Sequence, residues 1–115
     1  MTRLASIAKY HNRKAIVDGI AFDSAKEARR YSELKLLERA GEIVNLRVHV
    51  RYPLVVGGVK VCDYVCDFAY EEFVTGGRLK TAIEDVKSTP TRRLAAYRIK
   101  KKLMLAIWGI EIRET

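Results

Sequence analysis

The sequence predicts a single mixed α/β (α+β) domain, ordered as a helix, a three-stranded meander, a second helix and a short last strand. Two capped helical segments, 24–40 and 89–108, predict the helices. Three alternating segments between them are separated by two Gly-Gly turns and predict the meander. A chain of 115 residues is long enough for one hydrophobic core and too short for two. We therefore assign residues 15–115 to one domain and residues 1–14, which lack hydrophobic periodicity, to a basic N-terminal arm.

The first segments of the domain predict a small hairpin and then a helix. Asp18-Gly19 interrupts the apolar segment 15–22, as is typical of a tight turn. The helix begins at Asp23 or Ser24 and ends at about Ala40, before the glycine at position 41.

Glu27 has two possible roles in this helix. It completes a capping box with Ser24, in which the two residues satisfy each other's backbone amides. It also lies on the stripe of Tyr31 and Leu34, which faces the core. On that stripe its carboxylate could instead point toward the sheet, where a metal could recruit it.

The meander contains one acidic residue in an unexpected position. Segment 43–56 predicts the first strand, in which Pro53 indicates an edge or a bulge and His49 is interpreted as a half-exposed strand residue. Segment 59–73 predicts the second strand, with Asp67 in its most hydrophobic part. Burying an unpaired carboxylate costs several kcal/mol, so Asp67 requires a partner, a metal or access to solvent.

The third strand ends in the charged segment 81–88. Period-two alternation places Asp85 and Lys87 on one face and Glu84 on the other. One interpretation is an edge strand with a solvated charged face; the other is a metal-binding acid with a lysine that positions water. A strict two-residue turn at Gly76-Gly77 would set Asp67 opposite Val86. Only a longer loop or a bulge brings Asp67 and Asp85 together.

The second helix is predicted to begin at Thr89-Pro90 and to end at about Trp108. Its expected apolar stripe consists of Ala95, Ile99, Leu103 and Ala106. The adjoining polar face, suited to phosphate contacts and stacking, consists of Arg93, Tyr97, Lys100 and Lys101. Segment 110–113 alternates as a short final strand.

The charge distribution favours a polyanionic partner. The net charge is +8, and both the N-terminal arm and segment 89–102 are basic without a single acid. Lys9, Arg13 and Lys14 of the arm are therefore expected to contact nucleic acid together with the second helix. The sequence shows no membrane span or signal peptide, and Cys62 and Cys66 are interpreted as reduced core residues of a cytosolic protein.

The order of these acids resembles the αβββαβ core of the PD-(D/E)XK nuclease superfamily. More closely, the chain is similar to a family of small phage and prophage proteins of unknown function that are related to Holliday junction resolvases. The similarity covers most of the chain from about Lys9 onward. The stretches that carry it are FDSAKEARRY at 22–31, VRYPL at 50–54, CDF at 66–68, EDVK at 84–87 and YRIKKKL at 97–103.

The resemblance implies a restriction-endonuclease-like fold, with a mixed central sheet between two helices, and a metal-dependent phosphodiesterase. Asp67 and Asp85 would hold Mg²⁺ or Mn²⁺, with the Val86 carbonyl as a further ligand and Glu27 completing the site directly or through water. Lys87 would orient the attacking water and stabilise charge on the phosphate. The chain departs from the family pattern in having His49 for a glutamine, a cysteine at 66 for a small residue and a serine at 88 for a glycine.

We therefore expect an endonuclease that acts on branched DNA in phage recombination within the bacterial cytoplasm. We expect it to act as a homodimer, because symmetric cleavage of two strands requires two sites. The alternative is a non-catalytic nucleic-acid-binding protein that keeps the fold. A third hypothesis is a phage accessory protein that binds a host protein. The set Glu27, Asp67, Asp85 and Lys87 favours the enzyme, since buried acids repel DNA and a pure binder does not need them.

Overall fold

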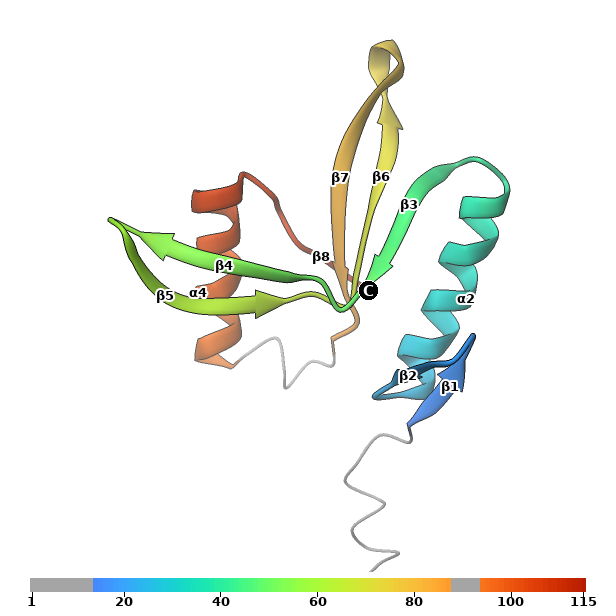
Figure 1. Ribbon diagram of the computed structural model, residues 1–115, viewed down its shortest axis with the longest axis horizontal. Helices are drawn as coiled ribbons and strands as arrows, with labels where there is room; N and C mark the ends of the chain where they lie inside the picture. The colour runs from blue at the N-terminus through green and yellow to red at the C-terminus, as the bar shows by residue number, and fades with distance from the viewer. Residues whose placement is uncertain (1–13, 88–93) are drawn as a thin grey trace, which may run out of the picture.

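A four-stranded mixed sheet lies at the centre of the computed structural model, which describes residues 14–87 and 94–115 (Figure 1). Its strands are ordered β3 (Ile43–Val48), β6 (Phe68–Val74), β7 (Arg78–Asp85) and β8 (Arg113–Glu114). The first three pair antiparallel, and β8 pairs parallel to β7. Helix α2 (Ala25–Arg39) lies beside β3, and α4 (Ala95–Leu103) lies at the other end of the molecule. The predicted α+β class, with a mixed sheet and two helices, is confirmed.

The N-terminal part of the domain agrees with the prediction. Strands β1 (Ala15–Val17) and β2 (Ile20–Phe22) form a hairpin whose turn residues, Asp18 and Gly19, both have positive φ. Helix α2 begins after Ser24, whose hydroxyl accepts a hydrogen bond from the Glu27 amide at 3.1 Å. The helix packs on the sheet through an aromatic cluster of Phe22, Tyr31 and Phe68.

The prediction of two long strands in the meander is wrong in one respect: each of these strands is broken near its middle. The first divides into β3 and β4 (Arg51–Val56), and the second into β5 (Val59–Val65) and β6. The breaks lie at the same level: the His49 amide donates to the Asp67 carbonyl, and the Cys66 amide donates to the Val50 carbonyl, each at 3.0 Å. His49 has a φ of 52°, which turns its strand away from extended geometry.

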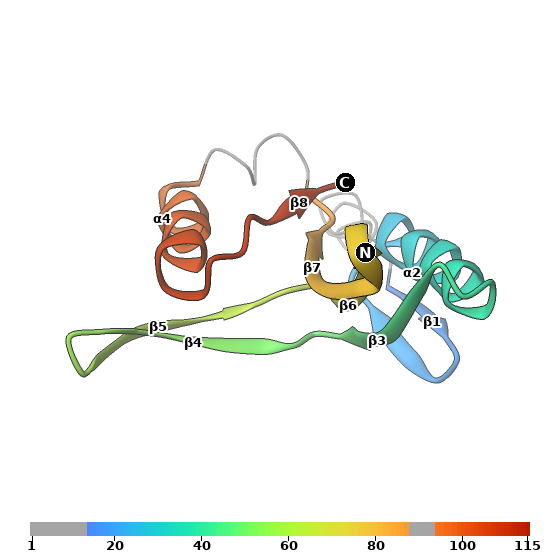
Figure 2. The same cartoon turned by 90° about the horizontal axis from the view of Figure 1, so that it is seen from above.

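The shared break exists because one meander packs against two helices. Beyond it, β4 and β5 continue as a two-stranded ribbon that extends away from the central sheet (Figures 1 and 2). Tyr52, Leu54 and Tyr64 of the ribbon form a second core with Met104, next to α4, and with Ala69 and Ile83 of the central sheet. Cys66 is a buried free thiol in this second core, as expected, and Cys62 is a half-buried one. The break therefore lets each end of the meander bury apolar side chains against a different helix.

The turn at Gly76-Gly77 brings the two predicted acids together. Val74 lies opposite Arg78, across a loop of three residues, Thr75–Gly77. The same register sets Phe68 opposite Glu84, so that Asp67 is level with Asp85. Of the two alternatives, the structure therefore has the longer loop, which the catalytic interpretation requires.

Helix α4 differs from its predicted pattern. It begins at Ala95, after Leu94 in extended backbone, and the predicted start at Thr89-Pro90 lies outside the described residues. A π-helical segment (Met104–Trp108) continues it to Gly109, close to the expected end. The predicted apolar stripe is wrong, because Ile99 is 56% exposed whereas Tyr97 and Met104 are buried. Tyrosine combines an apolar ring with a polar hydroxyl, so it suits either face, and here its ring is buried.

Within the described residues, neither helix is long and apolar enough to cross a bilayer. The predicted arm residues Lys9 and Arg13, and Arg93 before α4, lie outside those described.

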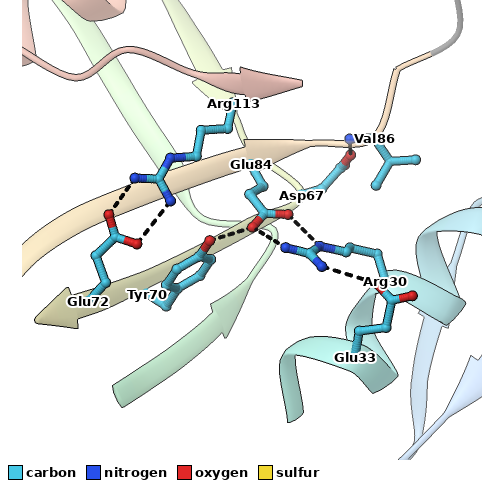
Figure 3. Close-up of polar contacts among 8 residues, drawn as sticks. All are labelled: Arg30, Glu33, Asp67, Tyr70, Glu72, Glu84, Val86 and Arg113. Atoms are coloured by element: carbon cyan, nitrogen blue, oxygen red, sulfur yellow. Dashed lines mark hydrogen bonds and ion pairs between the residues drawn. The ribbon is translucent and has the colours of Figure 1, made fainter. Parts of the chain in front are cut away.

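An ion pair between half-buried Arg30 and buried Glu84 fixes α2 to the central sheet. Arg30 donates to both carboxylate oxygens of Glu84 at 2.7 Å, and the Tyr70 hydroxyl donates to the same carboxylate (Figure 3). Glu84 is only 1% exposed, and its hydrogen bond raises the pKa of Arg30. The side chain of Glu84 thus lies with α2, whereas that of its neighbour Asp85 contacts Tyr64, in agreement with the predicted alternation of faces. Arg30 is one helical turn after Glu27, so this pair also sets the position of that residue.

Removing Arg30 alone should destabilise the fold more than removing the pair. Arg30→Met leaves Glu84 buried without its cationic partner, which typically costs about 3–5 kcal/mol. The double variant Arg30→Met/Glu84→Gln should recover much of that loss. Urea unfolding measures both, with Arg29→Met, at an exposed position of the same helix, as the control. Equal losses in the single and double variants would contradict this role for the pair.

Candidate metal and catalytic site

Four predicted site residues lie at the level where the meander bends. Glu27 comes from the first turn of α2, and Asp67 from the break between β5 and β6. Asp85 ends β7, and Lys87 follows it. His49, which the sequence analysis treated as an ordinary strand residue, joins them from the break between β3 and β4. The bend of the meander therefore creates the site.

Three of these side chains form a cluster of metal-binding donor atoms. One ligand atom each of Glu27, His49 and Asp67 lies within 4.8 Å of the other two. His49 Nε2 and Glu27 Oε1 are 3.2 Å apart. Different parts of Glu27 take part in the helix cap and in the cluster. Its backbone amide donates a hydrogen bond to the Ser24 hydroxyl, and its carboxylate belongs to the cluster.

Asp85 is the buried centre of a hydrogen-bond network beside this cluster. It is fully buried, and its Oδ1 accepts from the Asp67 amide at 3.0 Å. Its Oδ2 accepts from the Tyr64 hydroxyl and lies 3.8 Å from Lys87 Nζ. Asp67 Oδ2 in turn accepts from the Val86 amide at 2.7 Å (Figure 3). Both acids are thus tied to the backbone of the opposite strand.

Lys87 is held between Asp85 and an aromatic ring. Its Nζ lies 4.9 Å from the centre of the Tyr97 ring, within the range of a cation–π contact. The Tyr97 hydroxyl donates to Glu114 at 2.7 Å, and Lys101 Nζ lies 3.2 Å from the same carboxylate. The prediction that Tyr97 lies on a polar surface available for stacking is therefore wrong: its ring is buried and supports the lysine.

The carboxyl groups of the site are crowded and poorly solvated. Burial raises the pKa of Asp85 to about 6, although the Tyr64 hydrogen bond and the Lys87 charge oppose the shift. Burial also raises the pKa of Asp67, and burial together with the Asp67 charge raises that of Glu27. Negative charge is therefore costly here, and a bound cation would stabilise it.

Two residues important to the site were missed from the sequence. Tyr64 reads only as an inward-facing residue of an alternating strand, and its hydroxyl becomes significant once the register places Asp85 beside it. His49 carried one signal, its replacement of a glutamine in the family pattern.

Basic side chains of α2 also lie near the site. A surface pocket is lined by Lys26, Arg29, Arg30, Glu33, Val86 and Thr115. The sequence analysis assigned nucleic-acid contacts to the arm and α4, of which Lys14 is exposed and Lys100 is half-buried. It did not include this end of α2.

The chain belongs to the family described as "Protein of unknown function (DUF1064)", whose model matches residues 7–110. No curated protein and no solved structure gives a significant match. A family of unknown function was expected, and the description of the matching family names no activity.

The pKa of Asp85 predicts a specific pH dependence of stability. Because its folded-state value of about 6 exceeds the ordinary value of 3.8, the folded protein holds this proton more tightly than the unfolded chain. The stabilisation is complete below the ordinary value and is lost as the pH rises through about 6. Between about pH 4 and pH 7 the unfolding free energy of Asp85→Asn should therefore rise relative to wild type by about 2–3 kcal/mol.

Urea unfolding with EDTA present measures this difference. Comparison with wild type at each pH cancels the titration of distant groups such as Glu72 and Asp63. Parallel stability curves for the two proteins would contradict a raised pKa at Asp85.

Proposed function

We propose that the protein is a metal-dependent endodeoxyribonuclease of the PD-(D/E)XK type. The observation that carries this proposal is the three-residue loop at Thr75–Gly77, which sets Asp67 level with Asp85 and places Lys87 beside them. Sequence order alone left that arrangement open. The pattern of two acids and a lysine at the ends of paired strands, with Glu27 from the preceding helix, supports phosphodiester hydrolysis.

The residues present fit a divalent cation. Carboxylate oxygens of Glu27 and Asp67 converge in a site where burial raises the pKa of both acids. A bound Mg²⁺ or Mn²⁺ would supply Lewis acidity at the phosphate and lower the pKa of water. Asp85 would hold Asp67 in place through the hydrogen bond from the Asp67 amide. The Val86 carbonyl remains a candidate further ligand.

Lys87 would orient the attacking water and stabilise charge developing on the phosphate. Its side chain is only 20% exposed, and its ammonium is restrained by Asp85 and the Tyr97 ring, so little conformational freedom is left to lose in the transition state. Glu84 is fully engaged by Arg30 and Tyr70 and takes no part in this chemistry.

DNA would approach over the basic end of α2. Lys26 and Arg29 line a pocket together with Val86, the residue whose amide contacts Asp67. Phosphates placed there would lie next to the acids, and Lys14 and Lys100 would extend the contact surface. Branched DNA as substrate, action as a homodimer and a role in phage recombination in the bacterial cytoplasm belong to the same proposal.

The alternative, a nucleic-acid-binding protein without activity, is favoured by one observation. Both oxygens of Asp85 already accept hydrogen bonds from the protein, as in a purely structural carboxylate. The two functions are separated by cleavage assays.

Wild-type protein should nick a labelled four-way DNA junction when Mg²⁺ or Mn²⁺ is added and should not do so in EDTA. Lys87→Ala should reduce the rate by at least about 100-fold, as loss of one transition-state donor does elsewhere, while junction binding survives. Lys80→Ala, an exposed lysine near the other end of β7, should leave the rate unchanged. If the wild type cleaves no branched, duplex or single-stranded DNA with either ion, the enzyme proposal fails.

The α2 surface predicts a change in the salt dependence of DNA binding. If Lys26 and Arg29 each contact a phosphate, the double alanine variant should make the negative slope of log K against log salt shallower by about 2. Arg39→Ala, an exposed arginine at the far end of the same helix, should leave it unaltered. Fluorescence anisotropy over a salt series measures the slopes, and equal values for wild type and the double variant would reject this surface.

A further inference from the structure

We propose that His49 is a metal ligand and that Glu27, His49 and Asp67 together bind a first-row divalent transition ion, such as Mn²⁺, in preference to Mg²⁺. This inference deepens the proposed function by naming the class of ion. It depends on the proposed function only for what the ion is used for.

The geometry of the cluster is close to that of a coordination sphere. Atoms that bind one ion at about 2.0–2.3 Å lie roughly 3–4 Å from each other. The His49 and Glu27 donor atoms, at 3.2 Å, already meet this spacing, and all three donors lie within 4.8 Å.

The backbone holds two of the three ligands in register. The His49 amide donates to the Asp67 carbonyl at 3.0 Å, so the residues are joined directly across the shared break. Asp67 is further fixed by its contact with the Val86 amide. The imidazole also packs 5.9 Å from the ring of Phe22, which is fully buried. The His49 side chain is still 40% exposed, which leaves one side of the site open to water or a phosphate.

The chemistry of the donors determines the expected ion. Mg²⁺ requires oxygen ligands in near-ideal octahedral geometry and keeps several waters. An imidazole nitrogen instead suits first-row transition ions, and carboxylates also suit Mn²⁺. Two carboxylates with one imidazole therefore favour Mn²⁺ or Co²⁺ over Mg²⁺, whereas a glutamine at position 49 would offer an oxygen that suits both.

Asp85 is distinct from this ligand set. Both its oxygens accept hydrogen bonds from protein groups, one of them the Asp67 amide. It therefore positions Asp67 rather than completing the cluster, and His49 takes the place that the sequence analysis gave to Asp85.

Calorimetric titration of the intact protein with MnCl₂ and with MgCl₂, without DNA, tests the proposal. Wild type should bind Mn²⁺ at least about tenfold more tightly than Mg²⁺. His49→Gln should weaken Mn²⁺ binding by at least about tenfold, because even residues that only support a ligand contribute that much, and should change Mg²⁺ binding little. His11→Gln, at the only other histidine, is the matched control and should bind both ions like wild type. Unchanged Mn²⁺ affinity in His49→Gln would overturn the proposal.

Pulsed electron paramagnetic resonance of Mn²⁺ bound to the protein provides a second test, and its wild-type measurement alone can overturn the proposal. Coordination by His49 should produce a ¹⁴N modulation that disappears in His49→Gln and persists in His11→Gln. A spectrum of the wild-type complex without nitrogen coupling would overturn the proposal, whatever the stability of the variant.

These outcomes are separable from those of the proposed function. Nitrogen-coupled Mn²⁺ in a protein that cleaves no DNA would support the metal site and reject the nuclease. DNA cleavage by a protein whose Mn²⁺ affinity is unchanged in His49→Gln would support the nuclease and reject the metal site.

Discussion

The shared break in the meander, between β3 and β4 and between β5 and β6, is the constraint on which the rest of the molecule depends. One face of the sheet packs on α2, and the β4–β5 ribbon shares a second core with the other face next to α4, so both long strands bend at one level. Two backbone hydrogen bonds across the break keep the strands paired through the bend. The residues at that level lose regular pleating, and their side chains, His49 and Asp67, turn toward Glu27. Burial of the two cores therefore requires an irregular segment in the meander, and polar groups converge at that segment.

The convergence of acids is costly in the absence of a cation. Burial raises the pKa values of Asp67 and Asp85, and the described contacts supply one nearby lysine, itself shared with the Tyr97 ring. If these acids served only to stabilise the fold, apolar residues at the same positions would give a similar or higher free energy of unfolding. The network of Tyr64 and the backbone amides around Asp85 instead keeps the carboxylates in fixed positions, as a binding site for a cation requires.

Sequence reasoning predicted the elements and the acids because these depend on local patterns. The cap at Ser24, the hairpin at Asp18-Gly19 and the alternation of Glu84 and Asp85 each follow from neighbouring residues. The loop length at Gly76-Gly77 could not be decided, since the glycine pair suits turns of two or three residues. The role of His49 and the burial of Tyr97 depend on where distant strands break and which helix covers them, and no local pattern contains that information.

A crystal structure of the protein soaked in MnCl₂, with anomalous diffraction data, tests the central claim most directly. The account predicts an anomalous peak bonded to Glu27, His49 and Asp67, with Asp85 still bound to the Asp67 amide. A peak coordinated by Asp85 without His49, or no peak at the bend of the meander at saturating Mn²⁺, would contradict it.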